Sequence, residues 1–167
     1  MDVPAASDLM TRKTVTLSPE MSIQAAIALL LKNRISGAPV VDAEKKLVGV
    51  LSEKDCLRIF ANGAYNILPG GVVDHYMSKE VFTIPENADL FTIADTFLKH
   101  PFRRLPVVDA EGRLIGQVSR RDVLTGSRDI WAKTPNKPWT DAKYLTDQIK
   151  AALSGPTPGD STRGHTP

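Results

Sequence analysis

The 167-residue sequence contains a single cysteine, Cys56, and only three histidines, at widely separated positions 75, 100 and 165. One cysteine cannot form a disulfide within the chain, and it excludes a metal site built from several cysteine ligands. The histidines lack the close spacing that zinc ligands usually show. The sequence therefore predicts neither a disulfide-bonded scaffold nor a metal centre.

Charge of one sign and long apolar runs are also scarce. Residues 1–124 carry 15 Lys and Arg against 15 Asp and Glu, and residues 125–167 carry 6 against 4, which accounts for the net charge of +2. This excess is too small to favour nucleic acid, so any attraction to an anion has to be local. No apolar run approaches the length of a membrane span, and residues 1–10 lack the basic and apolar regions of a signal peptide. We expect a soluble cytoplasmic protein that engages neither nucleic acid nor membrane.

What the sequence does contain is an internal repeat. Pro39–Asp55 (PVVDAEKKLVGVLSEKD) recurs 67 residues later at Pro106–Asp122 (PVVDAEGRLIGQVSRRD). Extending the alignment to Met10–Leu57 on Met77–Leu124 needs no gap, and 15 of 48 positions are identical. Self-similarity at a fixed offset identifies a repeated structural unit. The chain is therefore a tandem duplication.

Each copy predicts the element order β-α-β-β-α. A short strand, Thr14–Leu17 or Val81–Ile84, precedes a helix whose apolar residues recur at i, i+3, i+4 and i+7 from Ile23 or Leu90. Two β-rich runs around a polar turn then predict a hairpin. The Ser-x-x-Asp that follows is typical of a helix N-terminus, where the hydroxyl and the acid cap backbone N–H groups.

A single unit of about 50–60 residues would hold a three-stranded sheet with little core of its own. We therefore expect an α/β (α+β) fold in which two β-α-β-β-α repeats pack through their sheets with pseudo-two-fold symmetry. The expected organisation is a first repeat over residues 1–64, a linker over 65–71, a second repeat over 72–126, an extension over 127–153 with an amphipathic helix from residue 140, and a disordered tail over 154–167.

The repeated h-x-P-V-V-D and h-h-G-h-h-S-x-x-D segments (h, apolar) resemble the cystathionine-β-synthase (CBS) domain family, and two in tandem resemble a Bateman module. The resemblance covers about residues 5–126, and both copies retain the motif. It implies a stand-alone regulatory module without catalysis or a required cofactor. The implied ligand is AMP, ADP, ATP or S-adenosylmethionine, bound in the cleft between the repeats. It also implies a homodimer that signals by conformational change to a regulated protein.

The resemblance carries roles onto particular residues. The acid of each motif, Asp55 or Asp122, is expected to accept hydrogen bonds from ribose hydroxyls, which suits a carboxylate with two acceptor oxygens. The motif serines are expected to reach sugar or phosphate, the first-strand threonines to face the same cleft, and the h-x-P segments to contact the base. These residues are Ser52, Ser119, Thr16, Thr83, Gly37, Ala38, Pro39, Val40, Arg104, Leu105, Pro106 and Val107.

A difference in charge between the two copies leads to a prediction that does not rest on the family resemblance. Glu53 and Lys54 follow the first motif serine, whereas two arginines follow the second, at a helix end that favours anions. Lys54 is included among the expected ligand-binding residues of the first site. Two further arginines precede the second hairpin. This placement predicts a phosphate near the second motif, bound by Arg103, Arg104, Arg120 and Arg121.

Structural alternatives accompany these predictions. Ser-x-x-Asp caps a helix with or without a ligand, and the arginines could extend into solvent or pair with Asp109 or Glu111. Ser36 and Gly37 stand where the second copy has its basic pair, so the first site is expected to be empty, weaker or suited to another ligand. The module could also be a dimerisation scaffold without a ligand. Nucleic-acid binding through the arginines is a third hypothesis, which predicts a steep salt dependence.

Overall fold

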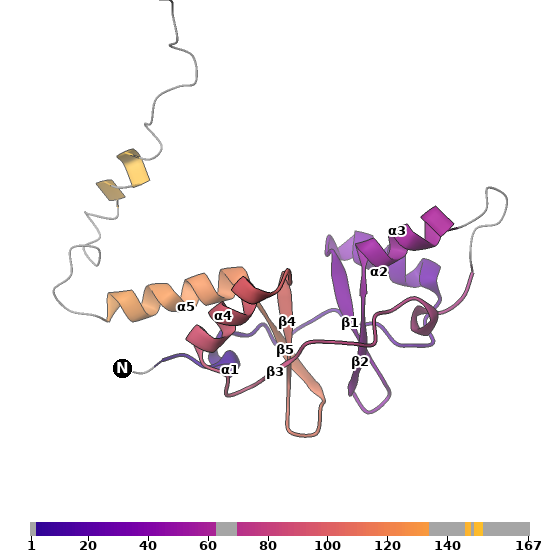
Figure 1. The fold of residues 1–167 in the computed structure, drawn as a ribbon, viewed down its shortest axis with the longest axis horizontal. Helices are drawn as coiled ribbons and strands as arrows, with labels where there is room; N and C mark the ends of the chain where they lie inside the picture. The colour runs from indigo at the N-terminus through magenta and orange to yellow at the C-terminus, as the bar shows by residue number, and fades with distance from the viewer. Residues whose placement is uncertain (1–2, 63–69, 134–145, 148, 152–167) are drawn as a thin grey trace, which may run out of the picture. The chain divides into compact units, whose positions relative to one another are not determined.

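The computed structural model describes residues 3–62, 70–133, 146–147 and 149–151. The chain divides into two units, residues 1–127 and 128–167, and the first contains both repeats (Figure 1). The elements in chain order are α1 (Ala6–Leu9), α2 (Ile23–Asn33), β1 (Gly37–Val41), β2 (Leu47–Ser52), α3 (Glu53–Asn62), the 3-10 helix η1 (Val73–His75), β3 (Ile84–Pro85), α4 (Leu90–Lys99), β4 (Arg104–Val108), β5 (Leu114–Ser119) and α5 (Arg120–Ala132).

The two predicted hairpins are confirmed, and they share one register. Strands β1 and β2 pair antiparallel with Gly37 opposite Ser52, and β4 and β5 pair antiparallel with Arg104 opposite Ser119. Both hairpins have an irregularity at the same place, after the first valine of Pro-Val-Val. The motif serine therefore lies at the end of a strand, beside the start of its partner strand.

The predicted first strands were too long. Val81–Ile84 is replaced by β3, which begins at Ile84 and pairs parallel with β4. In the first repeat only Leu17 pairs, as a parallel bridge to Val40, because the chain turns at Ser18 directly afterwards. One sheet therefore has three strands and the other has two.

The two predicted helical faces are confirmed. Helix α2 buries Ile23, Ala26 and Leu30, and α4 buries the equivalent residues Leu90, Ile93 and Phe97. Each helix has a capped start: Ser22 accepts the N–H of Ala25, and Asp89 accepts those of Phe91 and Thr92. The hydrogen bonds that Asp89 accepts from Thr92 are the main reason that its pKa lies below the usual value.

Backbone hydrogen bonds cross between the repeats in symmetric pairs. Thr11 and Gln117 exchange both of their backbone hydrogen bonds. Ser78, which corresponds to Thr11 in the second repeat, and Val50, which corresponds to Gln117 in the first, exchange the same pair at 2.9 and 3.0 Å. At the hairpin turns the N–H of Leu47 donates to Gly112, while that of Leu114 donates to Lys45. The first segment of each repeat, at Thr11 or Ser78, is thus hydrogen-bonded to the other repeat, about a pseudo-two-fold axis.

Side-chain packing follows the same crossed pattern. A Cβ added at Gly49 would lie 3.1 Å from the carbonyl oxygen of Ser78 and against the side chain of Met77, and one at Gly116 would lie 3.1 Å from that of Thr11 and against Met10. Met10 of the first repeat therefore covers Gly116 of the second, and Met77 of the second covers Gly49 of the first. Glycine is needed at both positions because backbone and side chain approach so closely.

Two sequence predictions fall mainly outside the described part of the chain. The helix expected from residue 140 is described only at residues 146–147 and 149–151, which are helical, and the expected tail over 154–167 lies wholly outside it. Within the described residues, no helix has the length and apolar character that crossing a membrane would need. A cytoplasmic location stays a prediction.

The crossed packing predicts the cost of filling either glycine. Gly49→Ala and Gly116→Ala should each lower the free energy of unfolding by about 1–3 kcal/mol, because the added methyl displaces a buried methionine and approaches backbone. Urea denaturation of the ligand-free protein measures this. Gly70→Ala is the control, since a Cβ there meets nothing within 4 Å. Equal stability of all three variants would contradict the close packing.

Candidate ligand-binding cleft

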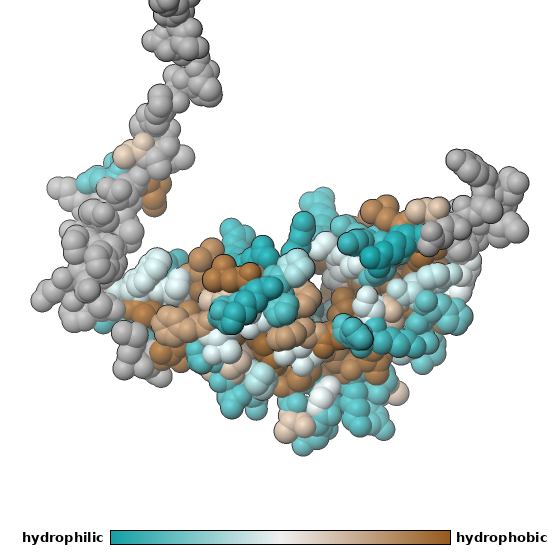
Figure 2. All heavy atoms as spheres, viewed as in Figure 1, coloured by the Kyte–Doolittle hydropathy of each residue, from teal (hydrophilic) through white to brown (hydrophobic). Residues whose placement is uncertain are grey.

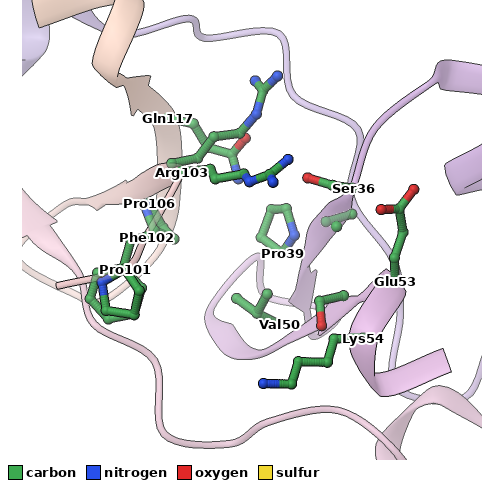
Figure 3. A pocket seen from close by; sticks show the side chains of 14 residues that line it. Ser36, Pro39, Val50, Glu53, Lys54, Pro101, Phe102, Arg103, Pro106 and Gln117 are labelled. Carbon is green, nitrogen blue, oxygen red and sulfur yellow. The ribbon is translucent and has the colours of Figure 1, made fainter. Parts of the chain in front are cut away.

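A cleft of about 450 Å³ lies between the two repeats, a size that suits a small organic ligand. Figure 3 shows Arg103 and Gln117 from the second repeat on one side and Ser36, Pro39 and Glu53 from the first on the other. The lining residues are Ser36, Gly37, Ala38, Pro39, Val50, Ser52, Glu53, Lys54, Pro101, Phe102, Arg103, Arg104, Pro106 and Gln117. Both repeats therefore contribute to one cavity.

The centre of the cleft is symmetric and one end is not. Pro39 and Pro106 are equivalent residues of the two hairpins, as are Val50 and Gln117, and all four line the cleft. Beyond this centre the lining continues to Ser52, Glu53 and Lys54 at the start of α3, and the equivalent residues of α5 do not line it. The cleft thus opens towards the motif of the first repeat.

Arg103 and Arg104 bring positive charge to this cleft. Their predicted alternative partners, Asp109 and Glu111, are instead held by Arg113, at 2.8 and 3.0 Å. Hydrogen bonds from Arg113 are the main reason that the pKa of Asp109 lies below its usual value, so this carboxylate stays ionised and paired. Within residues 3–62 and 70–133, neither Arg103 nor Arg104 has a carboxylate within 4.0 Å. Two cations are therefore available to an anionic ligand.

The other two predicted arginines lie elsewhere. The guanidinium carbon of Arg120 lies 5.9 Å from the centre of the Phe97 ring, over its face, which is a cation–π contact with α4. Arg121 lies in the first turn of α5 and does not line the cleft. The predicted cluster of four arginines is thus divided, and of the four only Arg103 and Arg104 line the cleft.

Each Ser-x-x-Asp motif forms a reciprocal helix cap. The Asp55 carboxylate accepts hydrogen bonds from the N–H and the hydroxyl of Ser52 at 2.9 and 2.6 Å, and the Ser52 hydroxyl accepts the N–H of Asp55 at 3.2 Å. Asp122 and Ser119 repeat this arrangement with corresponding bonds of 2.7, 2.7 and 3.3 Å. The predicted capping role is confirmed in both copies.

The cleft brings together only part of the predicted site. Eight predicted residues line it: Gly37, Ala38, Pro39, Ser52, Lys54, Arg103, Arg104 and Pro106. The others do not line it directly: Thr16, Val40, Asp55, Thr83, Leu105, Val107, Ser119, Arg120, Arg121 and Asp122. Val40, Leu105 and Val107 are fully buried in the core, which leaves backbone contact as their only route to a ligand.

Several lining residues were missed by the sequence analysis. Val50 and Gln117 lie on the second strand of each hairpin, and Glu53 follows the motif serine. All three lie within the repeated segments, so the alignment of the two copies could have identified them. Phe102 lines the cleft next to Pro101, and its ring stacks on His100 with centroids 5.2 Å apart. No local pattern distinguishes such an aromatic residue from one buried in the core.

Cys56 contributes no reactive group to this site. Its side chain is buried in the core of the first repeat. Burial, with a smaller effect of the neighbouring Asp55 charge, raises the pKa of its thiol, so it stays protonated near neutral pH and is a poor nucleophile. The described part of the chain also contains no group of three or more acidic, His or Cys residues that could hold a metal ion.

The capping geometry predicts different effects for two substitutions of one residue. Asp122→Ala removes the acceptor of both Ser119 hydrogen bonds and should lower the free energy of unfolding by about 1 kcal/mol. Asp122→Asn keeps an acceptor oxygen for the Ser119 N–H and should retain most of the stability. Urea denaturation without ligand compares the two, and equal losses would contradict the cap.

Comparison with known proteins identifies the fold. The family model of the CBS domain matches the chain twice, over residues 6–62 and 73–129. The CBS-pair protein CBSX2 from Arabidopsis thaliana, solved in complex with AMP, is 33% identical with a TM-score of 0.67, over 75% of this chain and 97% of that chain. The CBS domain pair of MJ0100, solved with 5′-methylthioadenosine and S-adenosyl-L-methionine, is 26% identical with a TM-score of 0.63, over 80% and 100%. The ATP-bound cytosolic domain of the Mg²⁺ channel MgtE is 30% identical with a TM-score of 0.62, over 72% and 48%.

One curated relative is a much longer enzyme. The inosine-5′-monophosphate dehydrogenase of Aquifex aeolicus is 35% identical over 111 residues, which make up 66% of this chain but only 22% of that protein. The similarity thus concerns a fifth of the dehydrogenase. The family model matches both repeats, and the sequence resemblance is confirmed. The chain belongs to the CBS domain family, as a tandem pair.

Proposed function

We propose that this CBS pair is a regulatory module that binds an adenine nucleotide, AMP, ADP or ATP, in the cleft between its repeats. The observation that carries the proposal is the pair Arg103 and Arg104 in the cleft lining, without carboxylate partners among the described residues and beside an apolar floor of Pro39, Val50 and Pro106. CBS pairs similar to this chain were solved with AMP and with ATP.

The parts of a nucleotide match the parts of the cleft. The proline and valine surfaces suit the base, since pockets for such ligands are mainly apolar with a few placed polar groups. Arg103 and Arg104 suit the phosphate, because a guanidinium can donate two parallel hydrogen bonds to its oxygens. The start of α3, which lines the cleft, also favours a negative charge. We assign the ribose to Ser52, which lines the cleft, and to Asp55 behind it, whose carboxylate accepts a hydrogen bond from the Ser52 hydroxyl.

Charge favours a nucleotide over S-adenosylmethionine, the alternative ligand. S-adenosylmethionine carries a sulfonium and an ammonium against one carboxylate, and is therefore a net cation. Arg103, Arg104 and Lys54 all line the cleft, with Glu53 as the opposing acid. A cationic ligand in a cleft lined by three cations would be repelled, which raises the free energy of the complex, so the cleft is better suited to an anion.

We infer regulation rather than catalysis. The titratable lining residues are one glutamate, one lysine and two arginines, a set that suits binding of an anion. Because both repeats supply lining residues, a bound nucleotide stabilises one arrangement of the repeats over others, which is a population shift. A regulated protein would then read that arrangement.

The nucleotide proposal is tested by isothermal titration with AMP, ADP, ATP, adenosine and S-adenosylmethionine. We expect saturable binding of the nucleotides. Replacing Arg103 and Arg104 together by Gln should lower the affinity for AMP at least about tenfold, since each charge-assisted hydrogen bond contributes about 1.5–3 kcal/mol. Adenosine should bind this variant as it binds the wild type, because it has no phosphate.

The matched control replaces Arg120 and Arg121 by Gln, which removes the same charge outside the cleft. It should leave the AMP affinity within about twofold, because exposed charges away from the ligand are screened. An equal loss in both double variants would show a general electrostatic effect and would contradict the assigned site. Absence of saturable binding for every ligand would favour the scaffold hypothesis.

We also propose that the module is a homodimer formed through its helices. Leu57 on α3 and Leu124 on α5 occupy equivalent positions and are 67% and 68% exposed, and Leu31 on α2 and Leu98 on α4 form a second equivalent pair. Figure 2 shows apolar residues at the surface of these helices. Exposed apolar side chains that recur in both repeats are typical of a surface that another copy covers.

Changing Leu57 and Leu124 together to Glu should abolish the dimer, because charge cannot be buried in an apolar contact without a partner. Analytical ultracentrifugation should then give the chain mass of 18.2 kDa in place of twice that value. Both side chains are exposed in the single chain, so circular dichroism should be unchanged. A variant that keeps the wild-type mass would place the interface elsewhere.

A further inference from the structure

The two Ser-x-x-Asp motifs differ in how their carboxylates are engaged. In the first repeat, Asp55 uses Oδ2 for Ser52, and its Oδ1 accepts a hydrogen bond from Arg58 Nη1 at 3.2 Å. In the second repeat, Asp122 also uses Oδ2 for Ser119. Within residues 3–62 and 70–133, no donor reaches Asp122 Oδ1. Both carboxylate oxygens of Asp55 therefore accept hydrogen bonds, whereas Asp122 retains one open oxygen among these residues.

A single residue difference produces this contrast. Arg58 stands three residues after Asp55, and Thr125 stands three residues after Asp122. Residues three apart on a helix lie on the same face, so the long Arg58 side chain reaches back to the carboxylate. The Thr125 hydroxyl instead donates to the carbonyl of Arg121 at 3.0 Å. Repeat one has therefore gained, or repeat two lost, a cation on its motif acid.

Burial agrees with this difference. Asp55 is 8% exposed and Asp122 is half-buried. Ser52 lines the cleft and holds Asp55 directly behind it through the 2.6 Å hydrogen bond. The proposed function assigns the ribose to Ser52 and to Asp55 behind it, and the Asp55 oxygen that Ser52 does not use is Oδ1, which Arg58 holds.

We propose that Arg58 competes with the ribose for Asp55. By holding Asp55 Oδ1, Arg58 lowers the nucleotide affinity of the first motif. This inference rests on the proposed nucleotide function and adds a specificity-determining residue to it. The Arg58 side chain is 62% exposed, so its pair with Asp55 is screened by solvent and a ligand can displace it. Arg58 then swings into solvent while two ribose hydroxyls take its place.

The sign of the effect separates competition from simple electrostatics. Removing a cation near an anion site weakens binding if the cation acts only through its charge. Removing a competitor strengthens binding. Arg58→Thr, which copies the second repeat, should therefore raise the affinity for AMP by about two- to fivefold, the effect of a pair of this exposure.

The ribose provides an internal control. The gain in Arg58→Thr should be present with AMP and absent with 2′,3′-dideoxy-AMP, which carries the same base and phosphate without the two hydroxyls. A purely structural role of Arg58 in α3 would change both ligands equally. Titrations in an Asp122→Asn background confine the measurement to the first motif and keep the second helix capped.

The reciprocal exchange at the second motif is the matched control. Thr125→Arg places a guanidinium three residues after Asp122, whose motif does not line the cleft, so it should leave the AMP affinity within about twofold. Weaker AMP binding in Arg58→Thr, or equal gains with AMP and its dideoxy analogue, would overturn the competition while leaving nucleotide binding intact. No saturable binding by the wild type or either variant would overturn both proposals.

Discussion

The structure depends on backbone hydrogen bonds that cross between the two repeats. Thr11 and Gln117 exchange a pair, and Ser78 and Val50 exchange the equivalent pair. Val50 and Gln117 also line the cleft, so the crossing that joins the repeats positions the cleft floor. A small repeat with one short sheet has little core of its own, and the exchanged entry segments supply the missing contacts. Stability and the candidate site therefore share one set of interactions.

Charge in the second repeat is divided between structure and binding. Arg113 pairs with both acids of its hairpin turn, and Arg120 lies over the ring of Phe97. These contacts satisfy the acids and one cation locally, which leaves Arg103 and Arg104 in the cleft without carboxylate partners among the described residues. An arginine that is already paired contributes little to a phosphate site, because the ligand would first have to displace its carboxylate.

Duplication provides a comparison within one chain. The capping pairs Ser52 with Asp55 and Ser119 with Asp122 have the same geometry, since both copies need a closed helix start. The copies diverge in their charged residues: Ser36 corresponds to Arg103, Glu53 to Arg120, and Arg58 to Thr125. Shared positions thus maintain the fold, and divergent positions give the two repeats different charge.

The sequence by itself determined the duplication and most of the features that depend on local pattern. The internal repeat follows from matching segments 67 residues apart. The buried faces of α2 and α4, the two hairpins and the Ser-x-x-Asp caps follow from spacings within about one helix or one turn. Tertiary structure alone decided the short first strands, the hydrogen bonds between each repeat's first segment and the other repeat, the separation of Arg103 and Arg104 from Arg120, and the presence of Phe102 in the cleft. These depend on contacts between residues far apart in the chain, which no local periodicity records.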